Sequence, residues 1–241
     1  MSGFVDLHSH YIPGVDDGVR SHADGVALCQ GLAALGYAQV VATPHIRTAM
    51  FDNRRGDLEA RFARFADQSA GETGMPELGL GAEHFCDDVF IGLFERGEAL
   101  PYPGGKALLI ELPSDSIPLA LEQQVFKMNV RGVRPVLAHP ERYSPLFRRT
   151  HALDRLLNMG VLPLLDIMSL TGKYGRWPRR ASERMLEEGV YYAACSDCHK
   201  PEDVPSVGAG IERLRELVGQ EEAQALLGEH PRAILRGEAE P

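Results

Sequence analysis

The sequence predicts an α/β protein in which helices cover a mostly parallel set of strands. Three observations favour this fold class. Short apolar runs alternate regularly with longer amphipathic stretches, the connections are short, and the runs are apolar nearly throughout, as in strands buried on both faces. The 241 residues, 44% of them hydrophobic, suffice for a substantial core. An open doubly wound sheet and a closed barrel both fit this alternation.

Strand and helix candidates follow one another along the whole chain. We expect seven strands, at 4–7, 40–43, 78–83, 107–112, 133–139, 161–167 and 190–197. Helices are expected at 22–36, 55–69, 87–96, 117–131, 151–159 and 178–188, with two closing helices at 206–218 and 220–227. In the helix at 55–69, Leu58, Phe62 and Phe65 share one face, which indicates core packing rather than a ligand pocket.

Composition narrows the class of protein. Because no linker or repeat divides the chain, we expect one domain over residues 1–241, with a frayed tail at 236–241. The net charge of -9 opposes nucleic-acid binding. No apolar run approaches the ~20 residues that span a bilayer, and no signal segment is present, so we expect no membrane insertion and a cytoplasmic location. The four cysteines should then stay reduced.

Polar residues gather where the predicted strands end. In parallel α/β proteins the carboxyl ends of the strands meet at one edge, where active sites form. Every strand except the one at 161–167 ends in a clear candidate. The candidates are His8, His10, His45, Glu83, Glu111, His139, Asp197 and His199, together with Asp17 in the loop after the first strand.

These five histidines and four carboxylates predict a metal centre. His8 and His10 share one face of a strand with Cα atoms roughly 6.5 Å apart, which lets two imidazoles bind one ion. A single buried histidine or acid is more often structural, but unpaired buried carboxylates at several strand ends would be costly without cations. The set implies two or three ions, and its nitrogen and oxygen donors admit manganese, zinc or iron. Three divalent ions would leave a local charge of about +2, which favours a dianionic substrate.

The remaining histidines and the CxxC motif receive structural assignments. Cys195 and Cys198 stand at a strand end rather than at a helix start, which argues against a redox role. None of the four cysteines is followed six positions later by the arginine that a cysteine-dependent phosphatase needs. The histidines assigned to structure or solvent are His22, His84, His151 and His230.

Five motifs, taken in chain order, resemble a known superfamily: "VDLHSHYIPGVDDG", "GAE", "LIEL", "AHPERY" and "SDCH". They are similar to the PHP (polymerase and histidinol phosphatase) superfamily, and within it to the bacterial tyrosine-protein phosphatases of capsule and exopolysaccharide clusters. The double-aspartate turn after HSH and the ERY motif are typical of this branch. The resemblance covers nearly the whole chain and implies a distorted seven-stranded (β/α)7 barrel with three divalent metal ions, manganese ahead of zinc or iron.

The resemblance also implies how the ligands are shared. The first ion would take His8, His10, Glu83 and Asp197, the second Glu83, Glu111 and His139, and the third Asp17, His45 and His199. The implied reaction is hydrolysis of phosphotyrosine through a metal-bridging hydroxide. The implied substrate is a tyrosine-phosphorylated bacterial kinase that regulates capsule or exopolysaccharide synthesis.

Two arginines are candidates for binding the phosphate, because a guanidinium matches two phosphate oxygens. Arg142, in "HPERY", matches an arginine of the family, and Arg47 follows the second-strand histidine. The family's further arginine after the last D-x-H is missing, since "KPEDVPSVG" stands there. Lys200 or an arginine from elsewhere would have to replace it.

Three other functions compete with this one. A phosphatase for a small metabolite such as histidinol phosphate would use the same centre with different pocket loops. A binuclear amidohydrolase also begins with HxH, but it commonly carries a modified lysine at an inner strand end. No middle strand here ends in one of the lysines Lys106, Lys127, Lys173 and Lys200. A metal-binding protein without catalytic activity would need only about four ligands and no open coordination position.

Overall fold

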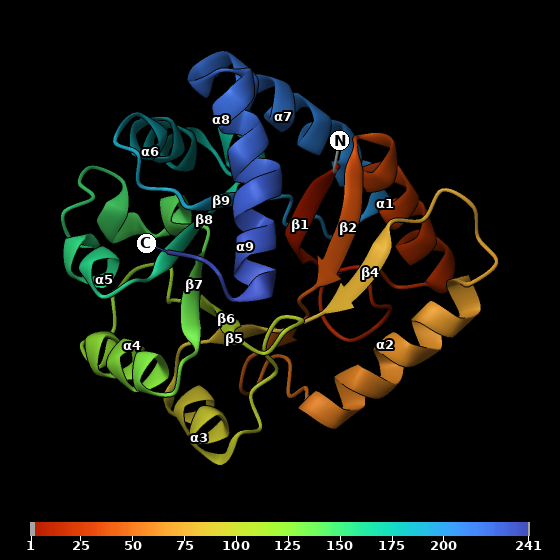
Figure 1. The fold of residues 1–241 in the computed structure, drawn as a ribbon, viewed down its shortest axis with the longest axis horizontal. Helices are drawn as coiled ribbons and strands as arrows, with labels where there is room; N and C mark the ends of the chain where they lie inside the picture. The colour runs from red at the N-terminus through yellow and green to blue at the C-terminus, as the bar shows by residue number, and fades with distance from the viewer. Residues whose placement is uncertain (1–2, 241) are drawn as a thin grey trace.

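The computed structural model describes residues 3–240 and has the expected α/β architecture (Figure 1). The strands are β1 (Phe4–Ser9), β2 (Tyr37–Ala42), β3 (His45–Ile46), β4 (Glu77–Leu80), β5 (Glu83–Phe85), β6 (Ala107–Glu111), β7 (Arg134–Ala138), β8 (Leu162–Asp166) and β9 (Ala193–Cys195). The helices are α1 (His22–Ala34), α2 (Arg55–Ser69), α3 (Asp88–Arg96), α4 (Leu121–Val130), α5 (Asp154–Asn158), α6 (Arg176–Glu187), α7 (Val204–Val218), α8 (Gln220–Gln224) and α9 (His230–Arg236).

The strands pair in parallel and form two sheets. One sheet has the order β1-β2-β4, and the other runs β3-β5-β6-β7-β8-β9. Short interruptions separate β3 from β2 and β5 from β4, with no helix between them, and the second interruption falls within the strand expected at 78–83. Pro44, which has no N–H to donate, stands at the first interruption. Hydrogen bonds from Gly81 N to Ala42 O (2.8 Å) and from Glu83 N to Pro44 O (3.1 Å) link the segments across the interruptions.

The end of β9 lies beside β1. Asp197 N donates to His8 O and His10 N donates to Cys198 O, both at 2.9 Å. Ser9 and Cys198 form an isolated parallel bridge. These contacts bring the last strand next to the first, in the order that a ring of strands requires. They form no continuous ladder, so closure into a (β/α)7 barrel stays a prediction.

Alternate residues of the strands enter two separate apolar clusters. In β6, Leu108 and Ile110 belong to a large cluster that includes buried residues of the helices, whereas Ala107 and Leu109 belong to a smaller one. Burial on both faces explains why the strands read as nearly continuous apolar runs. Ile234 of α9, which crosses the middle of the view in Figure 1, joins the smaller cluster.

The C-terminal segment differs from the expectation. The helix expected at 220–227 ends at Gln224, a π-helical turn covers Ala225–Glu229, and α9 was not foreseen. The tail is not frayed over its described part, because Glu238 N donates to Ala233 O at 2.9 Å and Ala239 is buried in the smaller cluster. Residue 241 lies outside the described residues. Tertiary packing, which local sequence does not reveal, orders this end.

Two further observations concern membrane-spanning helices and the cysteines. Within residues 3–240, none of the helices is both long and apolar enough to cross a membrane. The four cysteines are free and buried. Burial raises the pKa of the Cys86 thiol to about 12, with Asp87 adding to the shift. Such a thiol is a poor nucleophile at neutral pH.

Candidate metal centre

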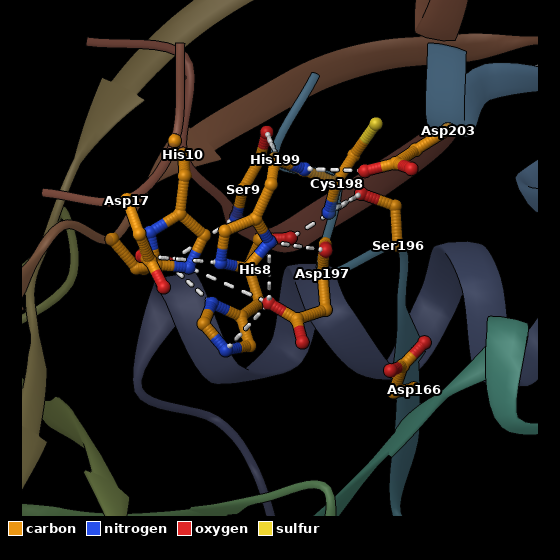
Figure 2. A network of polar contacts seen from close by, with 12 residues as sticks. His8, Ser9, His10, Asp17, Asp166, Ser196, Asp197, Cys198, His199 and Asp203 are labelled. Atoms are coloured by element: carbon orange, nitrogen blue, oxygen red, sulfur yellow. Dashed lines mark hydrogen bonds and ion pairs between the residues drawn. The ribbon is translucent and has the colours of Figure 1, made fainter. Parts of the chain in front are cut away.

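Side chains at the ends of β1 and β9 meet in one cluster (Figure 2). His8 belongs to β1 and His10 comes just after it, while Asp197 and His199 follow β9. The imidazoles of His10 and His199 stack with their ring centroids 4.0 Å apart. Asp17, from the loop after β1, places Oδ1 3.5 Å from His199 Nε2. The carboxyl ends of the strands therefore carry the polar site, as expected.

All nine predicted ligands take part in four overlapping groups. In each group, one candidate ligand atom per residue lies within 4.8 Å of all the others. The groups are His10, Asp17, His45 and His199; His8, His10 and Asp197; His8, Glu83 and His139; and His45, Glu83 and Glu111. Glu111 and His139, which the resemblance assigns to one ion, fall in different groups that share Glu83. Because the groups share members, they form one continuous cluster.

The carboxylate of Glu83 occupies the centre of this cluster. Its Oε2 atom lies 2.9 Å from His45 Nδ1, and its Oε1 atom lies 3.0 Å from His139 Nε2 and 3.4 Å from His8 Nε2. Only 1% of Glu83 is exposed. A buried carboxylate that reaches three imidazoles with two different oxygens has the placement of a bridging ligand.

Neighbouring polar groups orient the imidazoles. His8 Nδ1 lies 2.5 Å from Thr43 Oγ1, and His10 Nδ1 lies 2.7 Å from Asp16 Oδ2. These contacts leave the Nε2 atom of each ring for the cluster. Asp16 also accepts hydrogen bonds from Gly18 N at 3.0 Å and from His45 N at 3.1 Å. It therefore braces the turn after β1 and holds an imidazole at the same time.

The buried ligand atoms fit a group of cations. Within residues 3–240, His8 Nε2, His10 Nε2 and Glu111 Oε2 are buried and have no hydrogen-bond partner. Buried polar atoms without partners are costly, and native proteins normally satisfy them. Their residues all belong to the overlapping groups, so cations bound there would satisfy these atoms together. The donors are all nitrogen and oxygen, which suits manganese, zinc or iron.

The electrostatics of the cluster also favour positive charge. Burial opposes ionisation of Glu83, but the His8 and His45 imidazoles hold the pKa of this carboxyl well below its ordinary value. Burial lowers the pKa of His45 while the Glu83 charge raises it, with a net rise to about 11. Burial and the same charge raise the pKa of Glu111 to about 7. In the metal-free protein, protons thus provide positive charge that bound cations would replace.

Two ligand candidates sit in a backbone conformation that favours glycine. His139, just after β7, has a φ of 33°, and Asp197, just after β9, has a φ of 47°. For residues with a side chain this left-handed region costs on the order of 1–3 kcal/mol each, and such residues concentrate at functional sites. The surrounding structure stabilises both of them at the point where their side chains join the cluster.

Both candidate arginines border the cluster. The guanidinium of Arg142 pairs with Asp197 and lies 3.5 Å from Asp166 Oδ2, with the ring of Tyr174 4.5 Å beneath it. Arg47 lies 3.9 Å from Glu111 Oε2 and 4.1 Å from the centre of the Phe85 ring. The side chains of Arg142 and Arg47 are 29% and 34% exposed, so both can meet a ligand.

The strand at 161–167, the exception in the sequence pattern, also contributes to this edge. Asp166 ends β8, is fully buried, and approaches Arg142 with Oδ2, an atom that makes no hydrogen bond within the described residues. Burial and the nearby Asp197 raise its pKa well above the ordinary value. This strand end therefore also places an acid at the polar edge, and the sequence carries the same signal there, an acid that closes an apolar run.

The structural assignments of the other histidines agree with their contacts. His84 is buried away from the cluster, where Nδ1 lies 3.1 Å from Leu109 O and Nε2 accepts from Leu100 N at 3.1 Å. Burial lowers its pKa to about 4, which keeps the ring neutral. His22 begins α1, His230 begins α9, and His151 lies in a turn. The cluster therefore takes in five of the nine histidines of the chain.

A lysine approaches the strand end at which the family's arginine is missing. Lys173, from the segment after β8, pairs with Asp203 Oδ1 at 2.7 Å. The other oxygen of Asp203 accepts a hydrogen bond from His199 N at 3.2 Å. Lys200 makes no ion pair within residues 3–240. The replacement of the missing arginine by Lys200 or by an arginine from elsewhere stays a prediction.

Known proteins share the sequence pattern of this chain. A family described as capsular polysaccharide synthesis, CpsB/CapC, matches residues 4–236. The tyrosine-protein phosphatase YwqE of Bacillus subtilis is 28% identical over 200 residues, which cover 81% of this chain and 77% of YwqE. The tyrosine-protein phosphatase CpsB of Streptococcus pneumoniae is 22% identical over 237 residues, with coverage of 96% and 98%.

Solved structures share the fold. A structure described as YwqE from Bacillus subtilis and CpsB from Streptococcus pneumoniae, unique metal-dependent tyrosine phosphatases, matches with a TM-score of 0.90 at 24% identity, covering 98% of this chain and 95% of the other. A prolidase in complex with N-methylphosphonate-L-proline matches with a TM-score of 0.60 at 12% identity, covering 100% and 76%. The family match runs from the first residue of β1 to the last residue of α9, so this chain belongs to the CpsB/CapC family of capsular polysaccharide synthesis.

Proposed function

We propose that this protein is a metal-dependent protein-tyrosine phosphatase. The observation that carries the proposal is the continuous cluster of nine histidines and acids beside Arg142, with buried ligand atoms that lack hydrogen bonds. Membership of the CpsB/CapC family supports the activity, since YwqE and CpsB are named tyrosine-protein phosphatases. The single-domain organisation over residues 1–241 is part of the same proposal.

We assign the binding of three divalent ions, manganese in the first place, to the clustered side chains. These are His8, His10, Asp17, His45, Glu83, Glu111, His139, Asp197 and His199. When bound, the ions would activate a water molecule for attack on phosphorus and neutralise charge on the phosphoryl oxygens. Zinc or iron would suit the same donors.

The residues around the ligands would orient the imidazoles and bind the phosphate. Thr43 and Asp16 hold the imidazoles of His8 and His10 so that Nε2 faces the cluster. Arg142, fixed by Asp197 and by the Tyr174 ring, would bind the equatorial oxygens of the phosphate. Arg47, near Glu111, would bind a further oxygen.

The physiological substrate proposed here is a tyrosine-phosphorylated kinase that regulates capsule or exopolysaccharide synthesis. The family's description as capsular polysaccharide synthesis supports this choice. The main competitor is a phosphatase for a small metabolite such as histidinol phosphate. Both would use the same metal centre, so only relative turnover of the two substrates separates them.

The test is phosphate release by metal-free protein reloaded with manganese. A phosphotyrosine peptide and histidinol phosphate are compared, with His139→Ala and Arg142→Ala as variants. We expect peptide turnover that needs manganese and is lost in both variants. Turnover of histidinol phosphate alone would move the protein to the metabolite phosphatases, and no turnover of any phosphotyrosine peptide would refute the proposal.

A further inference from the structure

A groove of about 890 Å³ opens beside the metal centre. One wall is the segment 46–56, which leads from β3 into the first turn of α2, and the other is α3 with the two residues after it, Gly97 and Glu98. None of the nine predicted ligands lines this groove. Apart from Arg47, none of the lining residues has a role in the proposed chemistry.

The groove is continuous with the metal cluster. The ring of Phe51, which lines the groove, stacks on the imidazole of His45 with centroids 5.2 Å apart and planes within 10°. Arg47 lines the groove as well, and its guanidinium lies 3.9 Å from Glu111 in the cluster. A phosphotyrosine whose phosphate lies at the cluster would thus lead its neighbouring residues into the groove.

The wall formed by segment 46–56 is held in place by hydrogen bonds. Arg47 and Phe51 exchange two backbone hydrogen bonds, at 2.8 and 3.0 Å. The side-chain amide of Asn53 donates to Val15 O and to His45 O, both at 2.8 Å. A preformed wall reduces the conformational entropy that a peptide ligand would cost on binding.

The charges in the groove leave one cation unpaired. Arg55 pairs with Glu59, and Arg96 pairs with Glu98, both at 2.8 Å. Arg54 makes no ion pair within residues 3–240. A chain with a net charge of -9 therefore presents a positive side chain in a groove next to its proposed active site. A negatively charged side chain would be attracted to this cation.

The start of α2 adds to this preference. Arg54 is the N-cap of this 15-residue helix, and no side chain caps the free N–H groups of the first turn. Arg54, Arg55 and Gly56 all line the groove, and helix N-termini favour anions. The third acid of the groove, Asp52, already accepts a hydrogen bond from Ala49 N at 2.9 Å. Opposite, Val89 is 47% exposed and offers an apolar contact.

We propose that this groove binds the peptide segment next to the phosphotyrosine and selects substrates with an acidic residue there. Arg54 and the first turn of α2 would contact the carboxylate, and Val89 would contact an apolar side chain. The inference rests on the proposed tyrosine phosphatase function and specifies the class of phosphoprotein that the site takes.

The test compares two peptides that differ only in the residues beside phosphotyrosine, glutamate in one and lysine in the other. The manganese-loaded full chain, Arg54→Glu and Arg180→Glu are assayed. Arg180, exposed on α6 at a distance from the groove, gives a matched change of charge. p-Nitrophenyl phosphate, which has no peptide, reports an intact centre. Since an exposed charge pair contributes up to ~1 kcal/mol, we expect the unmodified protein to prefer the acidic peptide by up to about fivefold in kcat/KM.

Arg54→Glu should abolish this preference through a higher KM for the acidic peptide, with turnover of p-nitrophenyl phosphate unchanged. Arg180→Glu should keep the preference. Equal kcat/KM for both peptides in the unmodified protein would overturn the proposal that the groove selects acidic substrates. The same loss of preference in Arg180→Glu would overturn it as well.

Binding separates this inference from the proposed function. The same peptides are made with a non-hydrolysable phosphonate, labelled with a fluorophore, and followed by anisotropy. Tighter binding of the acidic phosphonate peptide without turnover of any phosphate ester supports peptide selection by the groove and refutes the proposed phosphatase function. Turnover of both peptides with equal binding refutes peptide selection by the groove and supports the proposed phosphatase function.

Discussion

The two ends of the parallel strands are built from opposite kinds of residue. At the carboxyl ends, His8, His10 and Glu111 bury polar atoms that make no hydrogen bond within the described residues. On the strands themselves, Ala107 of β6 and Leu162 of β8 join the smaller apolar cluster, which Ile234 and Ala239 of the C-terminal segment complete. One end contains unsatisfied polar atoms that a ligand would satisfy, and the other supplies side chains to the apolar core.

This difference indicates that the polar end serves the chemistry of the protein and the apolar end its stability. The left-handed conformations of His139 and Asp197 and the buried acid Asp166, whose Oδ2 makes no hydrogen bond within the described residues, all lie at the polar end. They are local costs of free energy that the apolar clusters below must offset. Substitutions at the polar end should therefore change activity and metal binding, and substitutions at the apolar end should change the free energy of unfolding.

The largest effect is expected from Glu83→Gln. It removes the central charge that three imidazoles contact. We expect kcat/KM on a phosphotyrosine peptide to fall about a thousandfold, about 4 kcal/mol of transition-state stabilisation. Manganese should raise the thermal midpoint of the unmodified protein, and this shift should shrink in the variant. Full activity with an unchanged shift would exclude Glu83 from the metal centre.

At the apolar end, Ile234→Ala should destabilise the protein by about 2–5 kcal/mol, because it leaves a cavity where α9 covers the smaller cluster. Urea unfolding measures the loss, and kcat of the folded fraction should not change. Leu235→Ala, at a partly buried neighbour, is the matched control and should cost less. A variant as stable as the unmodified protein would show that α9 contributes nothing to this end.

A more moderate effect is expected from Thr43→Val, which removes the hydroxyl beside His8 Nδ1 while keeping the shape of the side chain. Metal affinity, measured by competition with a chelator, should fall about 10- to 100-fold. Thr43→Ser keeps the hydroxyl and should restore most of the affinity. If serine and valine behaved alike, the hydroxyl would have no part in orienting His8.

The smallest effect is expected from Asp166→Asn. Arg142 loses one acidic neighbour and keeps its pair with Asp197, so KM for a phosphotyrosine peptide should rise only about fivefold. Because the variant removes a buried acid with an unpartnered oxygen, the free energy of unfolding should not fall. Asp154→Asn, at an exposed position on α5, is the control. A loss of stability with an unchanged KM would contradict a role in positioning Arg142.

Much of the fold was predictable because its signals are local. Alternating apolar and amphipathic stretches gave the parallel strands, and the helix at 55–69 has the predicted bounds. The interruptions before β3 and β5 were missed, because strands of two and three residues have no periodicity to detect. The tail was misjudged for a related reason, since the burial of Ala239 depends on strands far away in the sequence.

The sequence by itself determined which residues the site can use. Histidines and acids at the ends of apolar runs must meet, because parallel strands expose their carboxyl ends at one edge. Only the tertiary structure decided how the ligands group around Glu83, that Asp166 faces Arg142, and that segment 46–56 and α3 enclose a groove beside the cluster. The physical reason is that periodicity fixes the direction of a side chain relative to its own element, whereas the distance between side chains on different elements depends on how all the elements pack.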